Sequence, residues 1–147
     1  MRDKTFQVVI DTNVIVSALR SQYGASFKLF SLIGHRQFSK FEINVSVALA
    51  LEYEEVLSRN RTSLNLRLGD AAEIVNFLCQ VANRRNIFFL WRPFLQDKDD
   101  DFILELAVES NCDFVVTFNE KDFVGLETFG IKTVRPADFL EVIGEQG

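Results

Sequence analysis

The chain has 147 residues, of which 48% are hydrophobic and 25% are charged. This length and composition are typical of one globular domain, over residues 1–147, that forms its core without disulfides or metals. The formal net charge of −5 argues against a general phosphate-binding surface, because nonspecific affinity for nucleic acids comes largely from Lys and Arg.

Five apolar runs rich in β-branched and aromatic residues predict buried strands. In chain order they are "FQVVI" (6–10), "FEINVS" (41–46), "NIFFLW" (86–91), "DFVVTF" (113–118) and "IKTV" (131–134). Helical patterns lie between and after them, over residues 13–21, 25–34, 47–59, 70–85, 99–110, 119–130 and 136–144. Because strands alternate with helices, we expect an α/β fold with a mostly parallel five-stranded sheet that helices cover on both faces.

Two of the predicted helices carry local start signals. Asp70 and Glu73 have the spacing of a capping box. Pro136 suits the first position of the last helix, because its missing N–H would have no helical partner there.

The rare residue types exclude several kinds of site. Cys79 and Cys112 lie far apart without CxxC spacing, which predicts two reduced, buried thiols rather than a disulfide or a zinc site. His35 is the only histidine, which excludes sites built on several histidines and leaves a Ser or Cys nucleophile no recognisable base. The start "MRDKTF" lacks a signal peptide, and no apolar run approaches the roughly 20 residues that cross a bilayer, so we expect a cytoplasmic protein without membrane contact.

The first predicted strand runs directly into three polar residues, Asp11, Thr12 and Asn13. All three residue types cap helices by accepting the first free backbone N–H groups. The alternative is a catalytic carboxylate at the end of a buried strand, where open α/β sheets bind their ligands. This segment alone leaves both interpretations open.

Acidic residues follow the later strands in the same way. They are Glu52 in the helix after the second strand, Asp97, Asp99, Asp100 and Asp101 after the third, and Asp122, together with the amide Asn119, after the fourth. The carboxyl ends of parallel strands share one edge of a sheet, so these residues would meet Asp11 in a single crevice.

Helical spacing places Glu52 beside a buried face. At about 100° per residue, an apolar face is formed by Leu49, Tyr53, Val56 and Leu57. Glu52 lies roughly 40° from Val56, at the margin of this face, and Glu55 points further away. The alternative for Glu52 is an ordinary solvated helix residue.

The same spacing does not resolve the acidic cluster "QDKDDD". Asp99 and Asp100 both align with apolar residues three and four positions later, and both could instead be favourable charges at a helix N-terminus. Asp101 shares its side of the helix with Glu105, away from the apolar stripe. We interpret Asp97 and Asp101 as parts of a solvated acidic loop.

Separate structural roles do not explain why strand after strand ends in an acid. Ionised carboxylates that are brought together repel one another unless cations or protons neutralise them, which favours a metal site. Oxygen ligands without His or Cys suit Mg²⁺ or Mn²⁺. Two such ions about 4 Å apart can activate water and stabilise both the attacking and the leaving oxygen at a phosphodiester. An acidic chain can therefore still be a nuclease, provided that the rim of its cleft is basic.

Four segments in this order and spacing resemble the PIN-domain family, in particular the VapC-like toxins of bacterial toxin-antitoxin systems. They are "VVIDTNVIVSAL", "LEYEEVLSRN", "DKDDDFILELAVESNCDFVVTFNEKDF" and "GIKTVRPADFL". The resemblance implies a three-layer α/β/α sandwich and a metal-dependent endoribonuclease that uses Mg²⁺ or Mn²⁺. It also implies an RNA substrate, a cognate antitoxin protein and a homodimer.

The resemblance assigns roles to individual residues. Asp11 matches the first acid of the family, Asn13 its polar neighbour, and Glu52 the acid in the helix. Asp100, rather than Asp99, matches the acid that precedes an aliphatic position by three residues and an Ala by seven. These matches imply that Asp11, Glu52 and Asp100 are metal ligands, and Thr117 matches the threonine that closes the fourth strand.

The fourth acid of the family pattern is replaced here. Many PIN domains carry Asp where this chain has Asn119, and an amide can coordinate or orient water but brings no charge. The second ion is therefore expected to bind weakly unless Asp122 takes part. We predict Asn119 as a further catalytic residue. Supporting roles are expected for Asn13, Thr117 and Asp122.

Basic residues near the carboxyl edge are candidates for holding the RNA backbone. They are Arg20, Arg59 and Arg61. The alternative for each is a solvated surface charge.

Three alternative functions were compared with the nuclease. A receiver domain would also use a threonine and a lysine, as in Thr117 and Lys121, but the expected pair of acids before the end of the first strand is missing. A haloacid dehalogenase-like phosphatase needs a second Asp two residues after the first, where this chain has Asn13. A catalytically weak PIN fold that binds RNA or protein stays open because of Asn119.

Overall fold

The structure is a computed structural model that describes residues 5–34, 40–85 and 98–145, with the backbone alone described for residues 98–101. The five strands in these ranges form one sheet of order β3-β2-β1-β4-β5, in which every pairing is parallel. They are β1 (Phe6–Ile10), β2 (Phe41–Val45), β3 (Asn83–Arg84), β4 (Phe114–Val116) and β5 (Lys132–Val134). The predicted mostly parallel α/β fold is confirmed.

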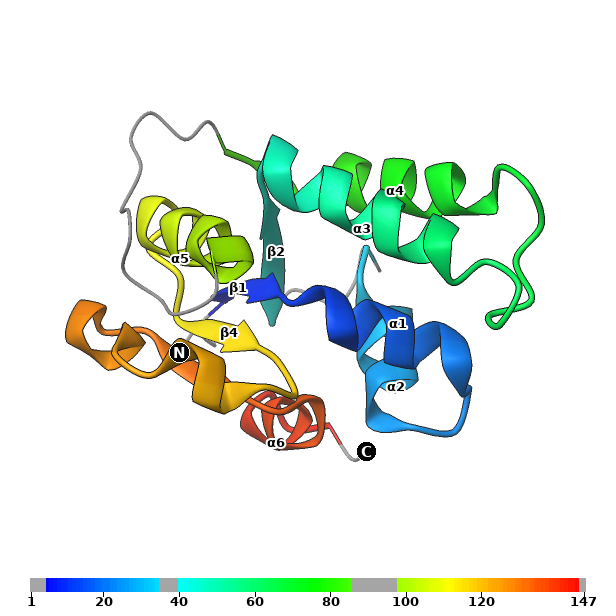
Figure 1. The fold of residues 1–147 in the computed structure, drawn as a ribbon. Helices are drawn as coiled ribbons and strands as arrows, with labels where there is room; N and C mark the ends of the chain where they lie inside the picture. The colour runs from blue at the N-terminus through cyan, green and yellow to red at the C-terminus, as the bar shows by residue number, and fades with distance from the viewer. Residues whose placement is uncertain (1–4, 35–39, 86–97, 146–147) are drawn as a thin grey trace.

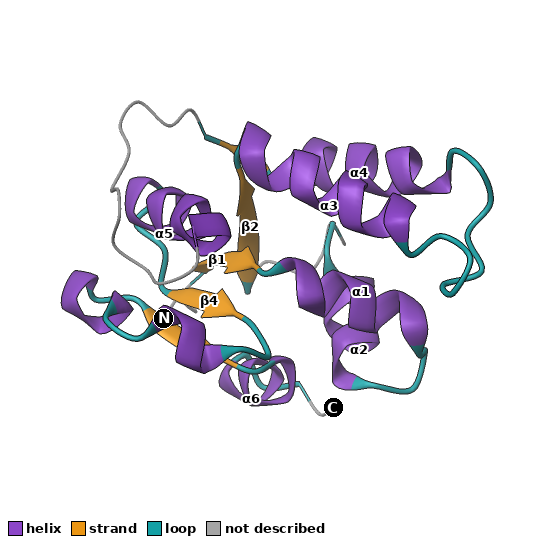
Figure 2. Cartoon of the chain, in the orientation of Figure 1, coloured by secondary structure: helices purple, strands orange, loops and turns teal. Residues whose placement is uncertain are grey.

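Helices flank the sheet on both sides. The described ranges contain α1 (Thr12–Arg20), α2 (Ala25–Leu32), α3 (Val47–Arg59), α4 (Asp70–Val81), α5 (Lys98–Glu109), α6 (Pro136–Val142) and two short 3₁₀ helices, η1 (Glu120–Phe123) and η2 (Leu126–Phe129). Figures 1 and 2 show α5 on one side of β2 and the pair α3 and α4 on the other. This arrangement explains why the second half of β1, in the middle of the sheet, is apolar: Val8, Val9 and Ile10 are at most 1% exposed.

An aromatic cluster fixes α6 against the sheet. The ring of Phe139 meets Phe6, Phe41 and Phe114 edge-on, with centroid distances of 6.5, 5.4 and 5.6 Å. These three partners come from three neighbouring strands, and their registry places all of them on the same face. The last helix therefore packs across β2, β1 and β4 together.

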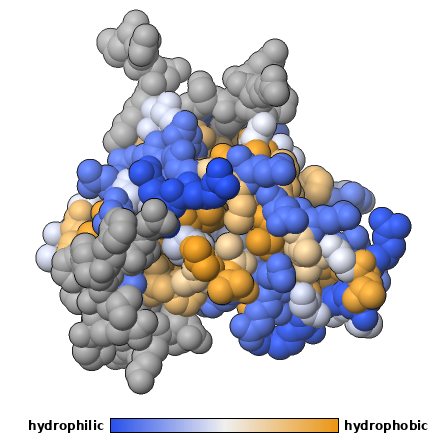
Figure 3. Space-filling model, turned by 90° about the horizontal axis from the view of Figure 1, so that it is seen from above, coloured by the Kyte–Doolittle hydropathy of each residue, from blue (hydrophilic) through white to orange (hydrophobic). Residues whose placement is uncertain are grey.

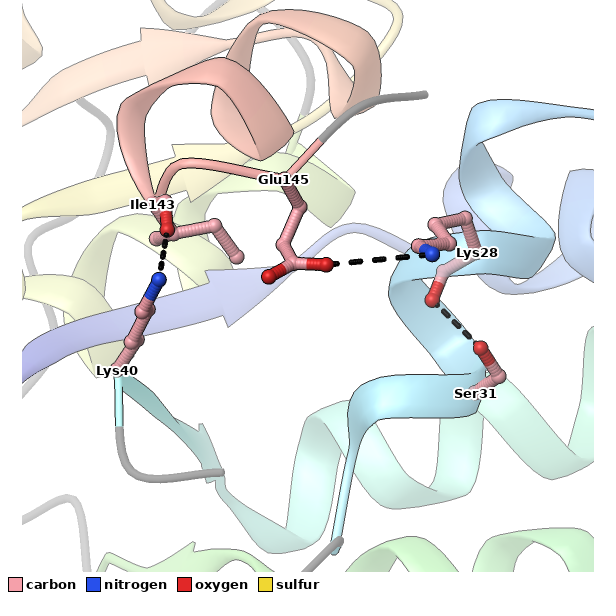
Figure 4. Close-up of polar contacts among 5 residues, drawn as sticks. All are labelled: Lys28, Ser31, Lys40, Ile143 and Glu145. Atoms are coloured by element: carbon pink, nitrogen blue, oxygen red, sulfur yellow. Dashed lines mark hydrogen bonds and ion pairs between the residues drawn. The ribbon is translucent and has the colours of Figure 1, made fainter. Parts of the chain in front are cut away.

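Polar contacts join the turn after α6 to α2 and to the start of β2 (Figure 4). The ammonium group of Lys40 donates a 2.7 Å hydrogen bond to the carbonyl of Ile143, and Lys28 lies 3.9 Å from the carboxylate of Glu145. Gly144 makes this turn in the left-handed region, at φ 80°. These contacts connect the end of the described chain to its first half.

Two predicted boundaries are corrected by the structure. The helix predicted over 70–85 ends at Val81, because Ala82 adopts an extended conformation, and Asn83–Arg84 pairs with β2 as a strand. The strand predicted at 86–91 lies outside the described residues. A strand of two residues has no measurable periodicity, so the sequence pattern could not locate β3.

The start of α4 also differs from the predicted capping box. Gly69, at φ 93°, is the N-cap, and no side chain caps the helix. The carboxylate of Asp70 instead accepts a 2.7 Å hydrogen bond from the backbone N–H of Arg67 in the preceding turn. By contrast, Pro136 stands at the first turn of α6 as predicted.

Two expectations about burial are corrected. Cys112 is buried, and burial raises the pKa of its thiol to about 12, but Cys79 is only half-buried. Glu105 is 3% exposed, so the side of α5 that it occupies is buried rather than solvated. The side chain of Asp101, which shares that side, is not among the described ones, and Asp97 lies outside the described residues.

Some hydrophobic side chains remain on the surface. Tyr23 is 90% exposed ahead of α2, and Val47 and Leu51 on α3 are 72% and 64% exposed. Figure 3 shows hydrophobic surface among hydrophilic regions on the face seen from above. Exposure of this scattered kind is normal in folded proteins and identifies no partner. No helix in the described ranges is long and apolar enough to span a membrane.

Candidate functional site

The ends of β1 and β4 bring Asp11 and Thr117 together. These strands pair in parallel with Ile10 opposite Val116, so the next residue on each strand leaves the sheet at the same edge. The hydroxyl of Thr117 donates a 2.7 Å hydrogen bond to Oδ2 of Asp11, and both side chains are buried. Residues 106 positions apart in the sequence thus share one site.

Asp11 also begins α1. It is the N-cap, and its Oδ1 accepts a 2.8 Å hydrogen bond from the backbone N–H of Thr12. The two interpretations of this residue are therefore compatible, because each carboxylate oxygen makes one of these bonds and keeps further acceptor capacity.

The electrostatic surroundings of Asp11 disfavour its charge. Burial raises the pKa of this carboxyl, the negative charge of Asp122 acts in the same direction, and the hydrogen bonds from Thr117 and Thr12 oppose the shift. Among the described residues, no Lys or Arg forms an ion pair with Asp11. A buried carboxylate of this kind is stabilised in its charged form by a cation.

Glu52 reaches the same place from α3. This helix starts at Ser46, whose hydroxyl accepts a 3.2 Å hydrogen bond from the N–H of Leu49. Tyr53, the next residue after Glu52, donates a 2.5 Å hydrogen bond from its hydroxyl to the carbonyl of Ile10 at the end of β1. Glu52 is half-buried, as its position at the margin of the apolar face predicts, and its carboxylate accepts a hydrogen bond from the hydroxyl of Thr12.

The chain after β4 forms the third side of the site. The side-chain oxygen of Asn13 accepts a 3.4 Å hydrogen bond from the N–H of Phe118, and Thr117 accepts a 2.9 Å bond from the N–H of Asn119. The N–H of Asp122 donates a 3.0 Å bond to the carbonyl of Asn119. Asn119 and Asp122 are thus held on one turn with exposed side chains.

These elements enclose a cleft of about 500 Å³. It is lined by Asp11, Thr12, Asn13, Val16, Ser17, Arg20, Glu52, Val56, Asn60, Phe118, Asn119 and Asp122. Six of these residues were predicted from the sequence, and Thr117 lies next to them through its bond to Asp11.

Arg59 and Arg61 do not line this cleft. Arg59 is exposed on α3 and lies 3.3 Å from Glu55, one helical turn earlier, and Arg61 is exposed in the following loop. The backbone of Asp100 lies in the first turn of α5, but its side chain is not among the described ones.

Sequence reasoning missed two residues that matter for the geometry. Thr12 was considered only as a cap, yet its hydroxyl binds a carboxylate 40 positions away. Phe118 was assigned to a buried strand, yet β4 ends at Val116 and Phe118 lines the cleft. No local pattern signals either contact, since both depend on the approach of distant elements.

The donor set of the cleft fits a hard divalent cation. The cleft offers carboxylate oxygens and amide oxygens, the ligands that Mg²⁺ and Mn²⁺ prefer. The carboxylates are those of Asp11, Glu52 and Asp122, and the amides are those of Asn13 and Asn119. Among the side chains that the structure describes, no three His, Cys, Asp or Glu are close enough to hold an ion by themselves. The described donors thus account for part of a coordination shell, which is compatible with ions that retain several waters.

Comparison with known families identifies the fold. A family model described as "PIN domain" matches residues 7–121, a range that contains the cleft residues from Asp11 to Asn119. The chain belongs to the PIN-domain family. PIN domains are generally nucleases, so a nuclease is the activity that the family associates with this fold.

Solved structures of similar fold agree with the PIN domain. One chain in the crystal structure of VapBC2 from Rickettsia felis, bound to a DNA fragment from its promoter, matches with a TM-score of 0.59 and 14% sequence identity. The match covers 86% of the present chain and 98% of the other. At this identity the similarity demonstrates the fold alone. Among curated proteins, none matches the chain.

Proposed function

We propose that this PIN domain is a Mg²⁺- or Mn²⁺-dependent endoribonuclease that hydrolyses RNA phosphodiester bonds, and that it is the toxin of a toxin-antitoxin pair. The observation that carries the nuclease proposal is the cleft in which Asp11 and Glu52 meet through Thr12. Thr12 bonds to both acids, to Asp11 through its backbone N–H and to Glu52 through its hydroxyl, so two acids from different elements are placed to share a cation.

In this proposal each residue of the cleft has a distinct task. Asp11 and Glu52 hold the metal, with Asp100 as a third ligand from the first turn of α5. When bound, the metal neutralises the charge of the phosphodiester and activates the attacking water. Thr117 and the N–H of Thr12 keep both oxygens of Asp11 oriented, and the hydroxyl of Thr12 does the same for Glu52.

The polar residues at the rim complete the proposed site. Asn119 and Asp122 lie on the turn after β4, where they can orient water, and Asn13 holds that turn through the N–H of Phe118. Arg20 lines the cleft and offers a guanidinium to the RNA backbone. Arg59 and Arg61 are assigned at most a peripheral role.

The partner proposals rest on the family resemblance and on the fold. The VapBC2 structure is that of a complex bound to a promoter DNA fragment, which supports an antitoxin protein as the partner of the present chain. A homodimer is likewise proposed from the family. Analytical ultracentrifugation of the purified chain, alone and with the product of an adjacent small gene, tests both.

Cleavage of total cellular RNA tests the nuclease proposal. Purified protein is incubated with Mn²⁺, with Mg²⁺ or with EDTA, and Asp11→Asn is assayed in parallel to reveal contaminating nuclease. We expect fragments that require metal and that disappear in Asp11→Asn, and mapping their ends would identify the target. Identical patterns from both proteins under every condition would overturn the proposal.

A second candidate function is a PIN fold that binds RNA or protein with little turnover. Asn119 favours it, because an amide at this position contributes no charge to a second ion. Asn119→Asp separates the two functions: a large gain in cleavage from a weak baseline indicates that the natural chain is mainly a binding module. Unchanged or lower cleavage supports the proposal that the natural chain, with Asn119, is an active nuclease.

A further inference from the structure

Phe118 is an aromatic residue placed beside the catalytic groups. It follows Thr117 and precedes Asn119, and it lines the same cleft as Glu52 and Val56 of α3. Its side chain is half-buried, whereas the neighbouring hydrophobic residues Val116 and Phe123 are at most 1% exposed. The ring therefore keeps accessible surface that a purely structural core residue would bury.

Three contacts hold Phe118 in place. Its backbone N–H donates to Asn13, and its carbonyl accepts a 3.4 Å hydrogen bond from Nη1 of Arg135. The guanidinium of Arg135 also lies over the ring, with Cζ 5.0 Å from the ring centroid. Arg135 itself is exposed and precedes Pro136, whose ring restricts the backbone at the start of α6.

An aromatic ring with a guanidinium beside it is a common arrangement for contacting a nucleobase. Base faces stack on aromatic side chains, and Arg adds cation–π attraction without reading the sequence through hydrogen bonds. The carboxylates of the cleft cannot serve this purpose, because they repel phosphates and offer no flat apolar surface. Only an unpaired base can expose its face for such a contact.

We propose that Phe118, backed by Arg135, is a stacking site for one unpaired nucleobase of a single-stranded RNA beside the bond that is cut. This inference rests on the proposed nuclease function and specifies how the substrate is held. In this proposal Phe118 and Arg135 bind a base regardless of its identity, and Arg20 binds the phosphate backbone through its charge.

Binding of short oligoribonucleotides tests the stacking site. Wild-type protein in EDTA is titrated with oligo(U), oligo(A) and an abasic ribose-phosphate oligomer of equal length, and affinity is read by fluorescence anisotropy. Phe118→Leu is expected to weaken binding of the base-bearing oligomers about 10-fold, within the range for loss of one base stack, and to leave the abasic oligomer unaffected. Phe118→Tyr, which keeps the ring, is expected to bind like wild type.

Salt dependence and the arginine provide independent readouts. Phe118→Leu removes no charge, so the slope of log Kd against log salt is expected to stay unchanged. Arg135→Ala is expected to weaken binding of the base-bearing oligomers more than binding of the abasic one. Arg67→Ala, which removes an exposed arginine near Asp70, is expected to leave both affinities unchanged. Circular dichroism melts of each variant check that the fold is retained.

The outcomes separate this inference from the nuclease proposal. Equal binding by wild type, Phe118→Leu and Arg135→Ala, in a protein that still cleaves RNA with metal, would overturn the stacking site alone. A 10-fold loss for the abasic oligomer as well would also overturn it, because the ring would then act through the fold or the backbone. A protein that neither binds these oligomers nor cleaves RNA would overturn both proposals.

Discussion

At the scale of single residues, the buried charge of Asp11 has consequences for stability. Burial raises the pKa of this carboxyl in the folded state, and Asp122 adds to the shift. An acid with a raised folded pKa contributes most stability below its unfolded pKa, and this contribution is lost as pH rises through the folded pKa. Without metal, the fold is therefore less stable above the folded pKa of Asp11 than below its unfolded pKa.

Asp11→Asn is expected to raise Tm in EDTA at pH 7. In the wild type Tm should fall as pH rises from the unfolded to the folded pKa of Asp11, and in the variant this fall should be smaller. The amide removes the charge that burial disfavours. Adding Mn²⁺ is expected to reverse the order: wild type gains about 2.7 kcal/mol when the ion is present at 100 times its Kd, and the variant gains less. Differential scanning fluorimetry measures both, and an equal Mn²⁺ response in the two proteins would contradict the metal assignment.

The arginines differ in their expected contribution to substrate binding. Arg20 lines the cleft, whereas Arg59 lies outside it beside Glu55. Arg20→Ala is expected to raise KM for RNA about 5- to 10-fold and to reduce the slope of binding against log salt by about one, the value for one lost phosphate contact. Arg59→Ala serves as the matched control, with an expected change in KM below about 2-fold. Equal effects of both substitutions would argue for a diffuse basic surface.

The residue scale also marks the limit of sequence reasoning. The position of Glu52 followed from helical spacing, because Leu49, Tyr53 and Leu57 define the buried side of α3. The bond from Thr12 to Glu52 did not, since it depends on how α1 and α3 approach each other. The burial of Glu105 also could not be anticipated, because an acid is normally assigned to the solvent side.

At the scale of elements, strong local patterns were reliable and weak ones were not. The range of β1 follows from a run of β-branched residues, and α3 occupies all of the predicted range 47–59 because an apolar face continues through it. The two-residue β3 was missed, and the helix before it was predicted four residues too long. Whether the chain forms one domain over residues 1–147 stays a prediction.

Tyr53 couples α3 to the end of β1. Its buried hydroxyl donates to the carbonyl of Ile10, one residue before Asp11. Tyr53→Phe is expected to lower the free energy of unfolding by about 1 kcal/mol, the usual net value of one hydrogen bond. Urea denaturation measures this change, with Tyr23→Phe at a 90% exposed position as the control.

The activity of Tyr53→Phe tests whether the Tyr53 hydrogen bond also positions Glu52. Because α3 carries Glu52, loosening this contact is expected to lower kcat more than it raises KM. A loss of stability without any change in kcat would indicate that the Tyr53 bond stabilises the fold and does not position Glu52.

At the scale of the whole molecule, strand order determines where the cleft lies. The chain moves from β1 outward to β2 and β3, and then returns through α5 to β4 on the other side of β1. Ligands of open α/β sheets bind where the strand order reverses in this way, outside the carboxyl ends of the strands. This edge could be predicted from the alternation of strands and helices, but the lining residues supplied by loops could not.

The stability of the whole chain is expected to depend strongly on Phe139. This fully buried ring contacts aromatic residues on three strands. Phe139→Ala is expected to cost about 3–5 kcal/mol, the usual range for removing a large aromatic side chain from a core. Phe27→Ala, at a 39% exposed position on α2, is the control in the same chemical-denaturation assay and should cost much less.

The two hydrogen bonds that Asp11 accepts affect how an inactive variant of this protein should be made. Its carboxylate starts α1 as well as facing the cleft, so replacing it by Ala would remove a helix cap worth about 0.5–2 kcal/mol along with the candidate ligand. Asn keeps the shape of the side chain and a capping oxygen; it loses the charge and exchanges the oxygen that accepts from Thr117 for an NH2 group. A dead variant built with Asn therefore reports on chemistry, whereas one built with Ala would mix lost activity with a frayed helix and a lower yield of folded protein.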